Sequence, residues 1–289
     1  VDEERFRTLM TEQRDRAKAD AKKKRSQVSD TSVYGDFRSH GETVFLGYDE
    51  LRNESTILGI IHQGQPVSQA GAGETVEVIL AETSLYPESG GQVADRGALV
   101  APGVHADVED VQRPVSGLIS HTVTVRTGEL SVGQSVSVEV DEANRYRARQ
   151  AHSATHLIHA ALRDTLGPHA TQAGSLNRSG YMRLDFSWTK SLADEQKLEI
   201  ETIANTAIHD DLPVETKVLP IDEAKKMGAM ALFGEKYGDT VRMVDIGGPW
   251  SRELCAGTHV SSSAQIGVIN LVQESSVSAG SRRVEALVG

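Results

Sequence analysis

The chain has 289 residues and a net charge of −11, with 38% hydrophobic and 25% charged residues, which is ordinary for a globular protein with more than one core. A single cysteine excludes a disulfide framework, and no apolar run approaches the length of a membrane span, so we expect a cytoplasmic protein without membrane contact. The acidic balance also excludes a uniformly basic nucleic-acid binder. Because the chain begins at Val1 rather than methionine, we interpret it as a piece of a longer protein.

Residues 1–30 are predicted to form a helical connecting arm. Glu, Arg, Lys, Ala and Gln dominate residues 1–25, and these residue types favour an exposed helix with a thin apolar stripe. Four consecutive basic residues, 22–25, lie near its end, where basic side chains stabilise the negative end of the helix dipole. RNA binding is therefore not needed to explain them.

Residues 31–140 are predicted to form a small antiparallel barrel or sandwich. Runs rich in β-branched residues alternate with turn residues, and the expected strands are 56–61, 74–80, 97–100, 121–125 and 136–140. Gly90 and Gly91 lie in a hairpin over 83–97, where paired glycines permit a positive φ and a close approach to another surface. The hairpin is not a phosphate-binding loop, because it lacks the Lys-Ser/Thr ending.

Residues 141–289 are predicted to form an α+β core, with helices packed on a mostly antiparallel sheet. Hydrophobic periodicity and end signals such as Gly167 and Pro168 define these elements. Helices are expected at 151–166, 191–212 and 221–231, and strands at 180–186, 214–219, 241–246, 266–272 and 282–287. On the first helix, the polar side that carries the histidines is expected to lie opposite the buried side.

Two pairs of metal-ligating residues share one spacing. His152 and His156 lie four residues apart on the predicted helix, so their side chains project from one face about 5–6 Å apart. Cys255, the sole cysteine, and His259 repeat that spacing on a predicted loop. Three imidazoles and a thiolate are typical zinc ligands. Because histidine pairs at this spacing also arise by chance, the hypothesis requires the two pairs to meet. His159 is interpreted as a pocket wall or surface residue rather than a fifth ligand.

Three separate motifs resemble the editing region of alanyl-tRNA synthetases, which also occurs in free-standing alanyl-tRNA editing proteins. They are HSATHL at 152–157, ELCAGTH at 253–259 and YPESGGQVADRG at 86–97; ALFGEKY at 231–237 and AGSRRVEA at 279–286 fit as well. Ala94 and Ala256 stand where the family commonly has glycine, and neither departure removes a ligand. The resemblance covers nearly the whole chain.

The resemblance implies hydrolytic proofreading of tRNA(Ala) mischarged with serine or glycine. The motifs for charging tRNA are absent from this chain, so it should edit without aminoacylating. Its implied partners are the acceptor end of tRNA(Ala) and the remaining domains of the parent synthetase, and its implied cofactor is zinc. The residues implied as both zinc ligands and catalytic residues are His152, His156, Cys255 and His259.

The bond to be cut is the ester between the amino acid and the terminal ribose. Zinc with an open position polarises such a carbonyl and lowers the pKa of water toward 7. No general base is apparent, because Ser153 stands where the H-E-x-x-H pattern has glutamate. A ribose hydroxyl of the substrate could act as the general base instead. A metal-free site, in which the same four side chains position water, remains an alternative.

Selecting serine over alanine requires a polar group that recognises one hydroxyl. Thr83, at the start of the hairpin, and Gln172, after the helix, are the candidates, although each also fits an ordinary strand or turn position.

The segment 141–190 has seven basic and four acidic side chains, so it is locally positive, as a phosphate-binding region or a solvated helix face would be. The predicted substrate-binding residues are Thr83, Gln172, Gly90, Gly91 and Arg183. The sequence offers no account of glycine recognition.

Two other functions stay open. The editing domain of threonyl-tRNA synthetase shares the two-pair motif, although the glycine hairpin and the β-rich region before the helix favour alanine. A non-catalytic RNA-binding module braced by zinc is the alternative from another class. Such a module would melt when the metal is removed and would never release an amino acid.

Overall fold

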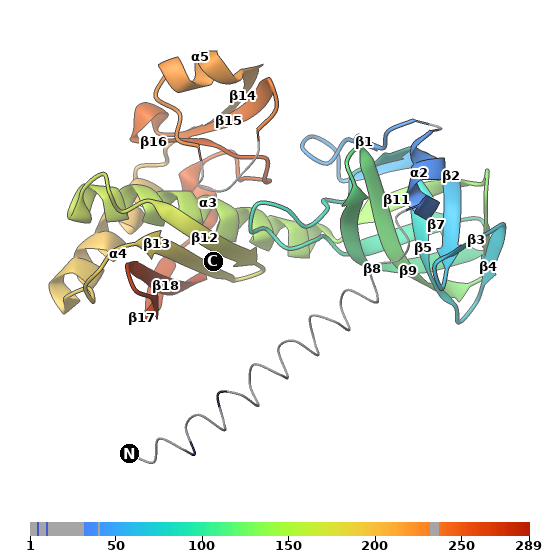
Figure 1. The fold of residues 1–289 in the computed structure, drawn as a ribbon, viewed down its shortest axis with the longest axis horizontal. Helices are drawn as coiled ribbons and strands as arrows, with labels where there is room; N and C mark the ends of the chain where they lie inside the picture. Colours follow the sequence, from blue (N-terminus) through green and yellow to red (C-terminus); the bar gives the residue numbers. More distant parts are fainter. Residues whose placement is uncertain (1–4, 6–9, 11–31, 40, 232–236) are drawn as a thin grey trace.

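The computed structural model describes residues 5, 10, 32–39, 41–231 and 237–289. The described chain is of the α+β class, as predicted, and forms two bodies joined by one long helix (Figure 1). The predicted arm over 1–30 lies outside the described residues apart from positions 5 and 10, and most of the motif at 231–237 does too. None of the helices within the described ranges combines the length and hydrophobicity of a membrane span.

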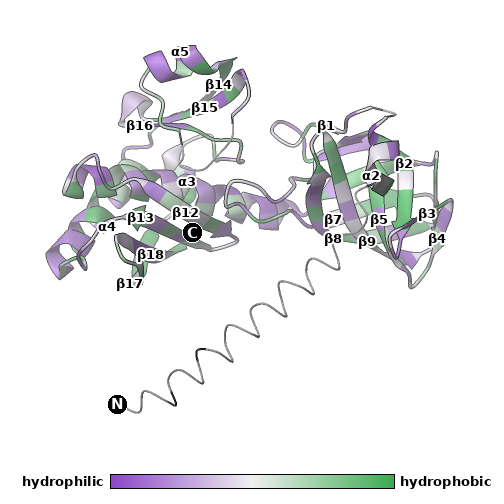
Figure 2. Cartoon of the chain, in the orientation of Figure 1, coloured by the Kyte–Doolittle hydropathy of each residue, from purple (hydrophilic) through white to green (hydrophobic). Residues whose placement is uncertain are grey.

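The first body is a closed antiparallel barrel, so the barrel alternative of the prediction is confirmed. Its strand order is β11-β7-β8-β9-β5-β2, and β11 pairs again with β2 to close the sheet. Hydrophobic and hydrophilic residues alternate along these strands (Figure 2), which directs one face of the sheet into the barrel core. The elements are α2 Ser32–Arg38, β1 Val44–Phe45, β2 Arg52–His62, β3 Gln65–Val67, β4 Gln69–Gly71, β5 Thr75–Leu80, β6 Glu82–Thr83, β7 Gly97–Ala101, β8 Val104–Val115, β9 Leu118–Thr127, β10 Glu129–Ser131 and β11 Ser135–Val140.

Helix α3 (Glu142–Leu166) connects the bodies and corrects two predictions. It begins at Glu142 rather than at residue 151, with the Asp141 carboxylate accepting a hydrogen bond from the backbone N–H of Asn144 at 3.0 Å. Every residue from Gln150 to Leu162 is buried, so the expected polar outer side is wrong. The reason is that neighbouring segments cover the helix on both sides.

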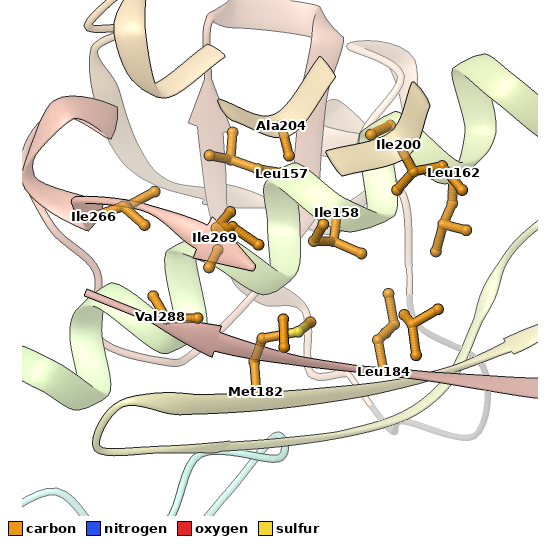
Figure 3. Close-up of a cluster of buried hydrophobic side chains, with 14 of the residues drawn as sticks. Leu157, Ile158, Leu162, Met182, Leu184, Ile200, Ala204, Ile266, Ile269 and Val288 are labelled. Carbon is orange, nitrogen blue, oxygen red and sulfur yellow. The ribbon is translucent and has the colours of Figure 1, made fainter. Parts of the chain in front are cut away.

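The second body packs helices on antiparallel sheets, as predicted. One sheet has the order β12-β13-β18-β17 and another the order β14-β15-β16. Leu157 and Ile158 of α3 contribute to a core shared with Met182 and Leu184 of β13 and Ile200 of α4 (Figure 3). The remaining elements are β12 Gln172–Arg178, β13 Tyr181–Ser187, α4 Asp194–His209, β14 Val214–Pro220, α5 Ile221–Lys226, β15 Thr240–Ile246, η1 Gly248–Trp250, β16 Ser251–Leu254, η2 Ser263–Ile266, β17 Ile269–Ser278 and β18 Ser281–Val288.

Several predicted elements of this body need correction. Strands β12 and β16 were not expected, α4 and α5 end earlier than predicted, and β17 lies later than 266–272. Residue 172, which one interpretation put in a turn, begins β12. These differences lie mostly at element ends, where local sequence signals are weakest.

A buried ion pair joins the barrel to α3. Arg145 and Asp95 are each 1% exposed and pair through the guanidinium and the carboxylate. Arg145 also donates to the backbone oxygens of Gly47 and Ser84, each at 2.7 Å. The same carboxylate accepts the backbone N–H of Tyr86 at 2.7 Å. This network fixes the start of the hairpin against the first turns of α3.

Candidate metal centre

The two predicted ligand pairs meet at one point. His152 and His156 come from α3, Cys255 directly follows β16, and His259 lies on the loop after it. Their ligand atoms all lie within 4.8 Å of one another. The sulfur of Cys255 is 3.4 Å from Nε2 of His152 and 3.4 Å from Nε2 of His259. The structure therefore brings together all four residues predicted as ligands.

The second ring nitrogen of two of these histidines contacts a polar side chain. Nδ1 of His152 lies 2.9 Å from Oε1 of Gln92, and Nδ1 of His259 lies 3.1 Å from the hydroxyl of Ser153. A proton on Nδ1 suits both contacts and leaves the Nε2 lone pair directed into the cluster. Such partners orient the ligating histidines of metal sites.

Glu253 of β16 supports the third histidine. Its carboxylate lies 3.4 Å from Nδ1 of His156 and 2.8 Å from Nδ1 of His159. Nε2 of His159 accepts the backbone N–H of Gln172 at 3.1 Å, so this ring carries its proton on Nδ1. Burial alone would raise the pKa of Glu253, but the adjacent His156 and His159 outweigh burial and lower the pKa to about 2. His159 is thus a buried support for the carboxylate, which corrects its interpretation as a surface residue.

The donor set suits a metal ion. Burial, with the neighbouring histidines, lowers the pKa of His152 and His259, and burial also lowers that of His156. Neutral rings are the form that binds metal. Nδ1 of His156 is buried and makes no hydrogen bond, although the Glu253 carboxylate faces it. These four residues could therefore hold a metal ion.

Gln92 of the hairpin links both ligand pairs to the barrel. It is fully buried, and besides His152 its Oε1 accepts the backbone N–H of Thr258 at 2.9 Å. Its Nε2 donates to the Thr258 hydroxyl at 2.8 Å. Gly91 before it has a φ of +79°, and a Cβ there would collide with Ser175 of β12. The sequence marks the hairpin but not Gln92 as a site residue, because the only local signal for Gln92 is its place after the paired glycines.

The remaining predicted substrate-binding residues lie outside the ligand cluster. Gln172 begins β12, and its side-chain amide lies 3.3 Å from the hydroxyl of Ser175. Arg183 lies on β13, with its Nε 4.0 Å from the carboxylate of Asp185. Gly90 has a φ of +57° and open space around it. Their substrate contacts stay predictions.

Thr83 lies buried inside the first body. Its hydroxyl is 2.9 Å from Nε2 of His121 and accepts the backbone N–H of Leu85 at 3.1 Å. Nδ1 of His121 donates to the backbone oxygen of Val78 at 3.0 Å, so Nε2 accepts the proton of the Thr83 hydroxyl. That hydroxyl is therefore engaged within the protein, and its role toward serine stays a prediction.

His121 is expected to make the barrel sensitive to acid. Burial lowers its pKa to about 4, so between pH 6.5 and 4 the unfolded chain binds the proton more tightly than the folded one. Stability that is fully present above pH 6.5 is lost as the pH falls through this window, by about 2 kcal/mol at pH 5. Urea unfolding between pH 7 and 5 should show a shallower pH dependence for His121→Gln than for the wild type. Equal slopes would contradict the assignment.

Glu253→Gln is expected to weaken metal binding about 10–100-fold, the usual effect of losing a group that orients a ligand. The amide keeps the shape of the side chain but removes the negative charge beside His156. Competition with a chromophoric chelator measures the affinity. Glu223→Gln, at an exposed position of α5, is the matched control and should bind like the wild type. Unchanged affinity in Glu253→Gln would rule out this supporting role.

Comparison with known proteins identifies the family. Residues 1–144 match the tRNA synthetases class II (A), and residues 241–285 match the second additional domain of threonyl and alanyl tRNA synthetases. The whole chain is 63% identical to an alanine–tRNA ligase of Clavibacter michiganensis and 60% identical to one of Leifsonia xyli, in each case covering 100% of this chain and 33% of the relative. A relative from Cutibacterium acnes is 54% identical over 288 residues, 32% of its length. The chain thus spans about one third of the length of these curated relatives, and it belongs to the alanyl-tRNA synthetase family.

Proposed function

We propose that this chain hydrolyses the ester of tRNA(Ala) mischarged with serine or glycine. The observation that carries the proposal is the convergence of three imidazole nitrogens and one cysteine sulfur within 4.8 Å of one another, in a chain closely similar to alanine–tRNA ligases. Its proposed partners are the acceptor end of tRNA(Ala) and the remaining domains of a synthetase, and its proposed compartment is the cytoplasm. The chain would edit without charging tRNA.

Zinc is the metal that we propose for the cluster, held by His152, His156, Cys255 and His259. When bound, it supplies Lewis-acid polarisation of the ester carbonyl and lowers the pKa of water. The protein side chains cannot provide either of these two effects themselves.

The side chains around the cluster orient the ligands and leave one side open. A Cβ on Gly257 would collide with the His152 ring, so glycine permits the loop to lie against that ligand. Cys255 and His259 are only partly buried. An ester can therefore approach the cluster from the side on which these two residues lie. Glu253 faces His156 and His159, so its carboxylate orients imidazoles rather than acting as a base on water.

Release of serine from seryl-tRNA(Ala) tests the proposed function. The purified zinc-loaded chain should release serine much faster than it releases alanine from alanyl-tRNA(Ala), and a chelator should stop the release until zinc is restored. Seryl-tRNA(Thr) is the comparator for the threonyl alternative, and it should be the poorer substrate. A folded, zinc-loaded chain that releases no serine would overturn the proposal, and unfolding by the chelator without prior activity would identify a zinc-braced module.

We propose Gln172 as the stronger of the two candidates for recognising the serine hydroxyl. Its backbone is bonded to His159, which the Glu253 carboxylate connects to His156, whereas the hydroxyl of Thr83 is bonded to His121. Gln172→Ala is expected to lower the ratio of serine to alanine release by about tenfold, the worth of one hydrogen bond.

Thr83→Val should lower the ratio less than Gln172→Ala. The rates of release from both aminoacyl-tRNAs measure the two ratios. Gln273→Ala, at an exposed position of β17, is the control. An unchanged ratio in both variants would exclude Thr83 and Gln172 from selectivity.

A further inference from the structure

A cleft of about 260 Å³ lies against the metal cluster. Its walls come from both bodies: Tyr48 precedes β2 of the barrel, Tyr146 and Arg149 belong to α3, and Arg242 belongs to β15. The cluster residue His259 forms part of the same wall. A molecule in this cleft would therefore contact both bodies and the exposed side of the cluster.

Arg149 and Arg242 bring uncompensated positive charge to the cleft. Within the described part of the chain, neither guanidinium lies within ion-pair distance of a carboxylate. Nε of Arg149 is buried without a hydrogen-bond partner, and its NH2 group makes only a long contact of 3.4 Å to the backbone oxygen of Tyr48. Asp49 is the one carboxylate of the cleft. The cleft is therefore net positive in a protein of net charge −11.

Arg242 also determines where an anion would lie relative to the cluster. Its NH1 group donates to the backbone oxygens of Cys255 and Gly257 at 3.0 and 2.9 Å. The guanidinium lies 4.3 Å from the ring centroid of Tyr48, whose hydroxyl donates to the backbone oxygen of Ala256 at 2.7 Å. The residue is thus anchored beside the ligand loop, and its other guanidinium N–H groups make no hydrogen bond to the residues that the structure describes.

We propose that this cleft binds the backbone phosphate of a single-stranded RNA 3′ end, with Arg149 and Arg242 as the phosphate contacts; the proposal rests on the proposed function. Guanidinium groups match phosphate oxygens in geometry and charge. An ester on the terminal ribose at the cluster places the 5′ phosphate of that nucleotide one ribose away, on the side of His259. Tyr146, which is 45% exposed, offers an aromatic face on which a base can stack.

Binding of a short RNA without an ester tests the cleft. The probe is a 5′-labelled ribotetranucleotide ACCA with a free 3′ end, titrated with the whole chain at several salt concentrations. Arg149→Gln should weaken binding about tenfold, since hydrogen bonds to charged groups are the stronger ones. The slope of log Kd against log salt should fall by about 0.7, the value for one phosphate contact on a single strand. Arg147→Gln, an exposed neighbour outside the cleft, removes the same charge and should change neither quantity.

A second probe identifies the phosphate itself. Replacing the last phosphodiester with a neutral methylphosphonate should weaken wild-type binding about as much as Arg149→Gln does, and should have little further effect in that variant. Wild-type affinity and salt slope in Arg149→Gln, with serine release intact, would overturn the cleft assignment and leave the proposed function standing. Binding that depends on Arg149, in a chain that releases no serine, would overturn the proposed function alone.

Discussion

Cys255→Ala is expected to abolish release of serine from seryl-tRNA(Ala). The substitution removes the only sulfur ligand of the cluster and leaves three imidazoles. Loss of a residue that merely supports a ligand costs metal sites about 10–100-fold, so loss of a ligand should exceed about 100-fold. The initial rate of serine release and the zinc content of the purified variant measure the effect together.

Two further variants make this result specific. His156→Ala should lose activity in the same way, whereas His209→Ala, at the exposed end of α4, removes a histidine without touching the cluster and should remain active. Full activity in both Cys255→Ala and His156→Ala would remove the metal-site mechanism. Activity that resists a chelator but is lost in Cys255→Ala would instead favour the metal-free site, in which the same side chains position water.

Arg145→Met is expected to lower the free energy of unfolding by about 3–5 kcal/mol, because it leaves a buried charge without its partner. The carboxylate of Asp95 and the backbone oxygens of Gly47 and Ser84 would all lose their donor in a region closed to water. Urea unfolding followed by circular dichroism measures the change over the whole chain. Tryptophan fluorescence follows the second body separately, since Trp188 and Trp250 both lie there.

Arg147→Met is the matched control for this prediction. It makes the same change at an exposed position on the same helix, where substitutions usually stay within about 0.5 kcal/mol. Combining Arg145→Met with Asp95→Asn should recover part of the loss, because the unpaired charge is then gone. An Arg145→Met protein as stable as the control would show that the ion pair does not hold the two bodies together.

The sequence predicted the features that repeat locally. Short runs of β-branched residues separated by turn residues predicted a barrel or sandwich, and the shared four-residue spacing predicted which side chains meet at the cluster. Strand β8 was missed because charged and polar residues separate its valines, so it contains no run of β-branched residues. Strand β12 was missed because Gly174, Ser175 and Asn177 are residue types of turns, and pairing with β13 overrides that preference.

The supports of the site could not be predicted, because they depend on partners far away in the chain. In the first turns of α3, Arg145 is buried by its ion pair with Asp95, which lies 50 residues away in the chain. Gln92 and Thr258 are separated by 166 residues, and His159 and Glu253 by 94. No local pattern marks such pairs, so the sequence reveals the ligands of the site but not what holds them.

The reach of Gln92 has a thermodynamic consequence. Its amide belongs to the barrel body, yet it contacts His152 from one ligand pair and Thr258 from the loop of the other. Capture of an ion by the cluster and docking of the barrel are therefore coupled equilibria. Linkage requires that each strengthens the other by the same factor, so an ion held among four side chains also tightens the joint between the two halves of the molecule.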